Sequence, residues 1–290
     1  MTKLHTLALA AGLALGATAG AQTAATPSAA PAKAAKKAAP AKPALVVEPR
    51  VLELLKATSA KLTAAPTMSF TATVSYEHPT RYGPPLVTTT RYDVTMQRPD
   101  KLRVLIPGDG PPREFYYDGK GMVVYLPNDG LAAVAAAPPT VDAALAQAFK
   151  TADVYFPFED LLLPDPYAAL AKGALLAFYT GPSAVVGGVA TDMVVWANRD
   201  VFLQMWIGTE DKLPRRFRAI YAADPKQLRY DMEFTNWQLG APVAPASFAS
   251  DKAQAAKKVD FAKPSLPPLP KTKPPAKPPA KPAAPAAKPQ

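Results

Sequence analysis

The sequence predicts a mainly β (α+β) protein in which about eleven antiparallel strands form a curved sheet with a few helices on one face. Through most of residues 69–237, apolar and polar residues alternate with a period of two, as in half-buried strands. Short turns rich in Gly, Pro, Asp and Asn separate these segments, which favours a meander over parallel βαβ units. One helical segment precedes the strands and another interrupts them, which predicts helices packed on one face.

Residues 1–21 have the features of a secretory signal peptide. Lys3 supplies a positive start, residues 4–16 are apolar, and Ala19-Gly20-Ala21 is a small-residue cleavage site. The alternative, an uncleaved membrane anchor, needs roughly 18 or more apolar residues, and this run is shorter. We therefore expect cleavage near Ala21 and a periplasmic product. The chain has no Cys, which excludes lipidation at a cysteine, disulfides and thiolate metal ligands.

Composition divides the rest of the chain into a predicted folded domain, residues 44–250, and two flanks, residues 22–43 and 251–290. The flanks consist largely of Ala, Pro and Lys and have too few large apolar side chains to offset the entropy of ordering, so both are predicted to be disordered. They account for the positive net charge of the chain, which is +10 overall, while the domain is close to neutral. After export, the anionic partners for such basic arms are membrane head groups, lipopolysaccharide or wall polymers rather than nucleic acid. The alternative is that the arms are solubilising spacers.

Eleven segments carry the strand pattern. In the first, Phe70, Ala72 and Val74 alternate with polar residues, and Asp118-Gly119-Lys120-Gly121 marks a hairpin further on. The expected strands are 69–76, 91–96, 102–106, 113–118, 122–126, 131–136, 175–180, 189–198, 201–208, 215–222 and 228–237.

Helices are expected at four places. Residues 49–62 carry apolar side chains at helical spacing, and residues 141–150 follow Thr140, which we expect to be the N-cap. Two short helices, 158–163 and 167–172, are expected on either side of prolines 164 and 166, which interrupt helical structure.

Several motifs together resemble a family of predicted periplasmic proteins with the lipoprotein-carrier (LolA/LolB-like) fold. The resemblance covers residues 46–250, and the motifs that carry it are RPDKLRV (98–104), FYYDGKGMVVYLP (115–127), APPTVDAAL (137–145), GPSAVVGGVATD (181–192), QMWIGTEDKLPRRFRAIY (204–221) and YDMEFTNWQL (230–239). It implies an incomplete antiparallel β-barrel of about eleven strands, wrapped around lid helices that cover an apolar cavity. It also implies binding of acyl chains, of lipoproteins or other lipids.

The inward-facing residues of the predicted strands form an apolar, aromatic and Met-rich surface. Met and aromatic side chains adapt to irregular contents, so this surface suits an acyl chain. The alternative is that the same surface packs only on the protein's own helices. The residues predicted to line the cavity are Phe70, Tyr92, Met96, Leu102, Val104, Phe115, Tyr117, Phe217, Tyr221, Tyr230, Met232 and Phe234.

Catalytic signals are weak, and the sequence predicts neither an enzyme nor a cofactor or metal site. Once the signal peptide is removed, His78 is the one remaining histidine, and we expect it in a solvated loop. Glu159, Asp160 and Asp165 are expected to cap or solvate a helix, since adjacent helical residues point in different directions.

The sequence therefore predicts a non-enzymatic, monomeric periplasmic binding protein that carries or senses a lipid or acylated ligand. The alternative is a protein-interaction or scaffold module of the envelope, tethered through its basic Pro-rich arms. A third reading, a hydrolase, has no motif to support it, and a screen on ester and glycoside substrates would test it.

Overall fold

The computed structural model describes residues 45–108, 110–171 and 173–263. The predicted signal peptide (1–21), the predicted linker (22–43) and the end of the predicted tail lie outside this part. The helices are α1 (Pro49–Thr63), α2 (Val141–Ala152), η1 (Glu159–Leu162), α3 (Pro166–Ala171), η2 (Val186–Gly188), η3 (Pro245–Phe248) and α4 (Asp251–Ala255). The strands are β1 (Thr67–His78), β2 (Leu86–Gln97), β3 (Lys101–Ile106), β4 (Arg113–Tyr117), β5 (Gly121–Leu126), β6 (Leu131–Ala136), β7 (Leu176–Ser183), β8 (Thr191–Ala197), β9 (Val201–Gly208), β10 (Pro214–Tyr221), β11 (Arg229–Leu239) and β12 (Lys257–Val259).

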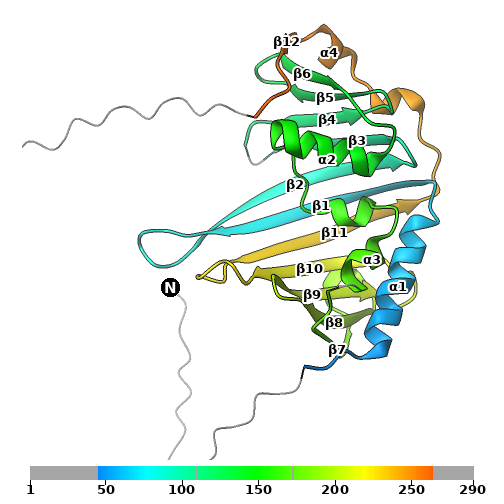
Figure 1. Ribbon diagram of the computed structural model, residues 1–290, viewed down its shortest axis with the longest axis vertical. Helices are drawn as coiled ribbons and strands as arrows, with labels where there is room; N and C mark the ends of the chain where they lie inside the picture. Colours follow the sequence, from blue (N-terminus) through cyan, green and yellow to red (C-terminus); the bar gives the residue numbers. More distant parts are fainter. Residues whose placement is uncertain (1–44, 109, 172, 264–290) are drawn as a thin grey trace, which may run out of the picture. The chain divides into compact units, whose positions relative to one another are not determined.

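The strands form one open sheet in the order β12-β6-β5-β4-β3-β2-β1-β11-β10-β9-β8-β7 (Figure 1). Strands β1 to β6 form one meander and β7 to β11 a second, and the pairing of β1 with β11 joins the two. All neighbours are antiparallel except β12, which runs parallel to β6. The predicted class, a mainly β protein with an open antiparallel sheet, is confirmed. The described sheet has twelve strands rather than eleven.

The extra strand comes from the predicted tail, because the ordered domain extends beyond the predicted boundary at residue 250. The Ser250 hydroxyl accepts a hydrogen bond from the Ala253 N–H at 3.2 Å and caps α4. Ala253 is buried against Tyr125 and Ala132, and β12 then pairs with the free edge of β6. Edge pairing satisfies backbone groups whatever the side chains are. Residues 251–263 are therefore ordered, which corrects the predicted disorder there.

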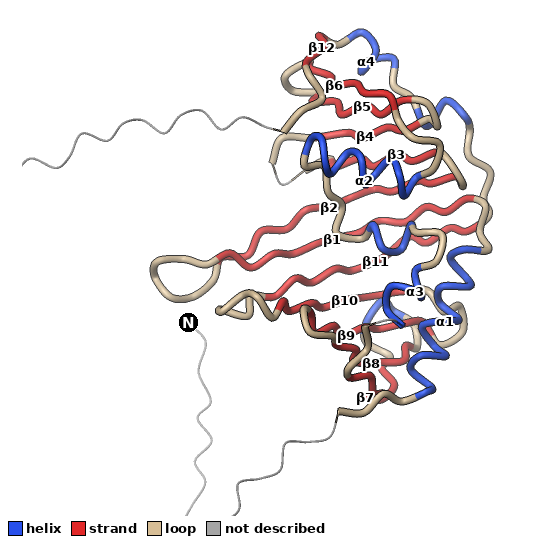
Figure 2. The backbone as a smooth tube through the Cα atoms, viewed as in Figure 1, coloured by secondary structure: helices blue, strands red, loops and turns tan. Residues whose placement is uncertain are grey.

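Helices α1 and α2, η1 and α3 cover one face of the sheet (Figures 1 and 2). On β1 to β4 the residues facing this layer stand in one cross-strand row, in which Phe70, Val94, Val104 and Phe115 are successive register partners. Side chains of α2 pack on the same core. Because successive side chains of a strand point to opposite sides, Tyr125 and its contact with α4 lie on the other face.

The start of α2 differs from the prediction in one detail. Thr140 occupies the N-cap position with extended backbone, but its hydroxyl makes no capping hydrogen bond. The Val141 N–H instead donates to the carbonyl of Pro99, in the turn between β2 and β3, at 2.9 Å. A tertiary contact thus satisfies a helix-end donor that a side chain was expected to serve.

Phe234 lies at the junction of the two meanders and is fully buried. We expect Phe234→Ala to lower the free energy of unfolding by about 3–5 kcal/mol, because the truncation leaves a cavity among the rings of Phe70, Phe217 and Trp237. Urea denaturation measures this change. The matched control is Phe202→Ala, whose side chain is 41% exposed and whose loss should cost far less. Equal losses in both variants would contradict this account of the core.

Candidate functional site

A cavity of about 270 Å³ lies between the helical layer and the second meander. Helix α1 forms one wall, residues 155–170 form another, and strands β8 to β11 form the floor. The lining residues are Leu55, Thr58, Ser59, Leu62, Tyr155, Pro157, Phe158, Asp160, Leu161, Pro166, Tyr167, Leu170, Trp196, Asn198, Val201, Leu203, Met205, Ile207, Phe217, Ala219, Tyr221 and Met232.

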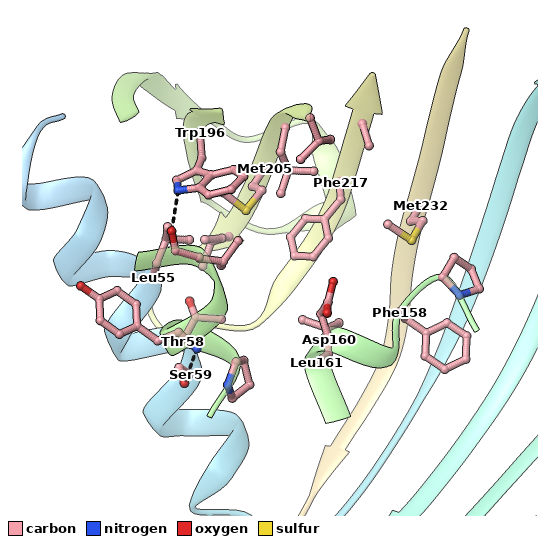
Figure 3. A pocket seen from close by; sticks show the side chains of 18 of the residues that line it. Leu55, Thr58, Ser59, Phe158, Asp160, Leu161, Trp196, Met205, Phe217 and Met232 are labelled. Atoms are coloured by element: carbon pink, nitrogen blue, oxygen red, sulfur yellow. Dashed lines mark hydrogen bonds between the residues drawn. The ribbon is translucent and has the colours of Figure 1, made fainter. Parts of the chain in front are cut away.

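Two hydrogen bonds fasten the helical walls to one another and to the sheet (Figure 3). The indole N–H of Trp196 on β8 donates to the carbonyl of Leu170 at 3.1 Å. The Tyr167 N–H donates to the Ser59 hydroxyl on α1, also at 3.1 Å. Because both bonds use backbone groups of α3, this short helix is held by its main chain, while Pro166, Tyr167 and Leu170 line the cavity.

A third contact holds the wall formed by residues 155–170 at the end of η1. The Arg98 guanidinium, from the turn before β3, donates to the carbonyls of Leu162 and Leu163 at 3.2 and 3.3 Å. Burial lowers the pKa of Arg98, which still remains charged because the ordinary pKa of an arginine is so high. The guanidinium therefore serves the carbonyls at the end of η1, which have no partner within that helix.

The structure distributes the predicted cavity residues between this cavity and the solid core. Phe217, Tyr221 and Met232 line the cavity. Tyr230 lies beside it, with its ring edge-on to Tyr221 at a centroid distance of 5.2 Å. The remaining eight are buried in the core of the sheet: Phe70, Tyr92, Met96, Leu102, Val104, Phe115, Tyr117 and Phe234.

Aromatic side chains fill the half of the concave face that β1 to β4 provide. The rings of Phe156 and Phe158 stack at 5.7 Å. Phe158 meets Tyr92 at 5.3 Å and Phe156 meets Phe115 at 5.4 Å, both edge-on. Edge-on contacts at these distances are favourable, so the segment between α2 and η1 packs firmly here. The space is left on the other half, over β8 to β11.

Most of the cavity wall was missed by reasoning from the sequence. Residues 158–163 and 167–172 were assigned to short helices without a binding role, and Trp196 and Met205 were not among the predicted lining residues. One signal was available: Leu55, Thr58 and Leu62 lie on one face of α1, with a polar residue in the middle of an apolar stripe. That stripe faces the cavity.

Asp160 is the charged residue in the lining (Figure 3). Its side chain points from η1 toward Phe217, and it keeps access to solvent at the mouth. The neighbouring apolar side chains remove part of its hydration, which raises the pKa of the carboxyl. Burial, together with the negative charge of Asp160, also raises the pKa of Glu159. Neither carboxylate has an ion-pair or hydrogen-bond partner among the described residues.

The site also contains an aliphatic hydroxyl, that of Thr58, and two phenols, those of Tyr155 and Tyr221. The Thr58 side chain is 7% exposed, and its hydroxyl has no hydrogen-bond partner within the described part of the chain. Tyr155 and Tyr221 stand at the rim, partly exposed, and burial raises the pKa of each phenol. Both phenols are therefore neutral at physiological pH and able to donate hydrogen bonds.

Other candidate groups lie elsewhere. His78 is exposed at the end of β1, and its Nε2 lies 2.8 Å from the Thr88 hydroxyl. Within residues 45–108, 110–171 and 173–263, no group of three or more His, Cys, Asp or Glu side chains is placed to hold a metal ion. None of the helices in this part is long and apolar enough to cross a bilayer.

Comparison with known proteins gives a family and several similar folds. A family model described as "Predicted periplasmic protein (DUF2092)" matches residues 52–262. The search of curated proteins finds no match. The predicted family, with its periplasmic location, is confirmed by the family match.

Among solved structures, a MucA/MucB complex from Pseudomonas aeruginosa matches at 16% identity and a TM-score of 0.41, over 70% of this chain and 62% of the other. This chain thus spans less than two thirds of that relative. A LolA-superfamily protein from Nitrosomonas europaea matches at 11% identity and a TM-score of 0.33, over 68% of this chain and 98% of the other. A putative outer-membrane lipoprotein-sorting protein domain from Vibrio parahaemolyticus matches at 9% identity and a TM-score of 0.34, over 69% and 96%.

The raised pKa of Asp160 has a consequence for stability. A carboxyl whose pKa is higher in the folded than in the unfolded state favours folding most below its ordinary pKa, and that contribution is lost as the pH rises through the folded-state pKa. We therefore expect Asp160→Asn to raise the free energy of unfolding at pH 7, by less than about 1 kcal/mol because solvent screens the exposed carboxylate.

Urea denaturation at several pH values checks this expectation, and the gain should disappear below the ordinary pKa range of an Asp carboxyl. Asp165→Asn is the matched control. The Asp165 carboxylate accepts a hydrogen bond from the Ala168 N–H at 3.0 Å, and the amide oxygen of Asn can accept the same bond, so Asp165→Asn should give no gain in stability. A loss of stability in Asp160→Asn at pH 7 would show that the carboxylate has a stabilising partner.

Proposed function

Because this chain belongs to the DUF2092 family of predicted periplasmic proteins, we propose that it binds a single acyl chain, or a similarly slender apolar group, in the cavity over β8 to β11. The protein would carry or sense that ligand in the periplasm. The observation that carries the proposal is the cavity itself, which is enclosed by mostly apolar side chains.

The size of the cavity favours one chain over a larger ligand. Its volume of about 270 Å³ lies just below the range of about 300–1,000 Å³ typical of small-molecule sites. At about 30 Å³ for each water-sized group, the cavity holds about nine such groups, and a methylene is of similar size. A lipid with several long chains would need more room than this.

The lining suits a flexible chain. Met205 and Met232 face the cavity, and thioether side chains adjust to irregular contents. Phe217 and Trp196 add flat apolar surface. Each methylene that leaves water contributes roughly 0.8 kcal/mol, so affinity is expected to rise with chain length until the cavity is full.

The basic flanks add a second part to the proposal. Residues 22–43 carry four Lys and no acidic residue, and residues 264–290 are also rich in Lys and Pro. Such segments attract anionic surfaces of the envelope, including lipid head groups, and would hold the binding domain close to a source of ligand.

A substitution that fills the cavity tests the binding site. Ala219 lies on its floor and is buried. We expect Ala219→Phe to occupy the space and to weaken the binding of 1-decanol at least tenfold, because the added ring takes the volume that the chain requires. Isothermal titration calorimetry gives the affinity, and native mass spectrometry of the protein from its own periplasm detects ligand that co-purifies.

Ala136→Phe, an identical change at an exposed position of β6, is the control and should leave decanol binding unchanged. Two results would overturn the proposal: wild-type protein that neither carries lipid nor binds decanol, or a folded Ala219→Phe variant that binds decanol as the wild type does. The first result would favour the alternative role, an interaction module whose interior serves only its own packing.

A further inference from the structure

Two polar groups in the wall of the cavity lack partners, and they lie on different elements. The Thr58 hydroxyl, on α1, is more than nine-tenths buried and unpaired among the described residues. A buried hydroxyl without a hydrogen bond costs roughly 1–3 kcal/mol, so its place in a mostly apolar wall needs a reason. Asp160, on the neighbouring η1, is the second group.

The charge in the described cavity lining is of one sign. The described lining residues include one carboxylate and no Lys, Arg or His. Burial is what perturbs the Asp160 carboxyl, and no cation offsets it. Glu159 directly precedes Asp160 in η1 and has a raised pKa in part because of the negative charge of Asp160. The mouth is therefore a region of negative potential.

That potential selects among ligands with the same tail. A carboxylate or phosphate head placed at the mouth would meet Asp160 without any compensating cation, and both groups would lose water. A protonated amine would instead form a charge-assisted hydrogen bond with Asp160. The Tyr155 and Tyr221 rings stand at the same rim, and aromatic faces attract cations.

On the basis of the proposed function, we infer that the natural ligand is an amphiphile whose polar head is a cationic hydrogen-bond donor, such as a protonated amine, held by Asp160. The Thr58 hydroxyl supplies a further acceptor for a polar atom of the ligand. Free fatty acids and other anionic single-chain lipids are the ligands that this cavity rejects.

The test compares three probes that share a ten-carbon tail and differ in the charge of the head: decylamine, 1-decanol and decanoate. Binding to the full-length protein is measured by isothermal titration calorimetry at pH 7, below the critical micelle concentration of each probe. We expect decylamine to bind at least tenfold more tightly than decanoate, which corresponds to about 1.4 kcal/mol, with decanol between them.

Two substitutions distinguish the contribution of the polar groups to binding from that of the apolar cavity. Asp160→Asn should weaken decylamine binding about tenfold, strengthen decanoate binding and change decanol binding less than either. Thr58→Val keeps the shape of the side chain and removes its hydroxyl, so it should weaken decylamine more than decanol. Asp129→Asn, in the turn between β5 and β6, removes one negative charge far from the cavity lining and should leave the preference as it is.

Each outcome bears on one of the two proposals. If decanol binds but decanoate binds as tightly as decylamine, or if the preference for decylamine survives Asp160→Asn, the cationic head is wrong while the acyl-chain cavity stands. If none of the three probes binds, the proposed function fails and the head-group inference fails with it.

Discussion

The pairing of β1 with β11 is the constraint on which the rest of the structure depends. It joins residues more than 150 positions apart, since Val74 stands opposite Met232 and Ala72 opposite Phe234. Without it the chain would form two separate meanders, each with an exposed apolar face. With it, one continuous concave surface forms, and the rings of Phe70, Phe234 and Trp237 pack along the seam. The helices then have a single surface to cover.

The helical layer packs more closely on the first meander than on the second, and the cavity lies where the packing is less close. Over the first meander, α2 and the stacked pair Phe156 and Phe158 fill the space with rings in direct contact. Over the second, α1 packs through Val51 and Leu55, and hydrogen bonds of Ser59 and Trp196 hold α3. A cavity is left between these helices and the strands. A uniformly packed interior would be more stable, because an empty cavity forfeits dispersion contacts with every atom that lines it.

The polar groups of the cavity, like its empty space, lower the stability of the domain. An unpaired hydroxyl at Thr58 and a partly desolvated carboxylate at Asp160 both oppose folding. Their cost is small beside the burial of the core, so the domain tolerates them. Polar groups that lower stability and have no partner within the protein are typical of binding sites, because a ligand can supply the missing partner.

The sequence by itself determined the strand pattern and the helical insertion. It also determined the family of periplasmic proteins and the apolar character of residues such as Phe70 and Phe234. Those properties are local or periodic, so a short window of sequence contains them. The tertiary structure decided which apolar residues face a cavity and which face one another. Phe115 and Phe217 have the same strand pattern, but Phe115 packs against Phe156 while Phe217 lines the cavity. It also decided that residues 251–263 are ordered, because β12 depends on the free edge of β6, which no local composition can reveal.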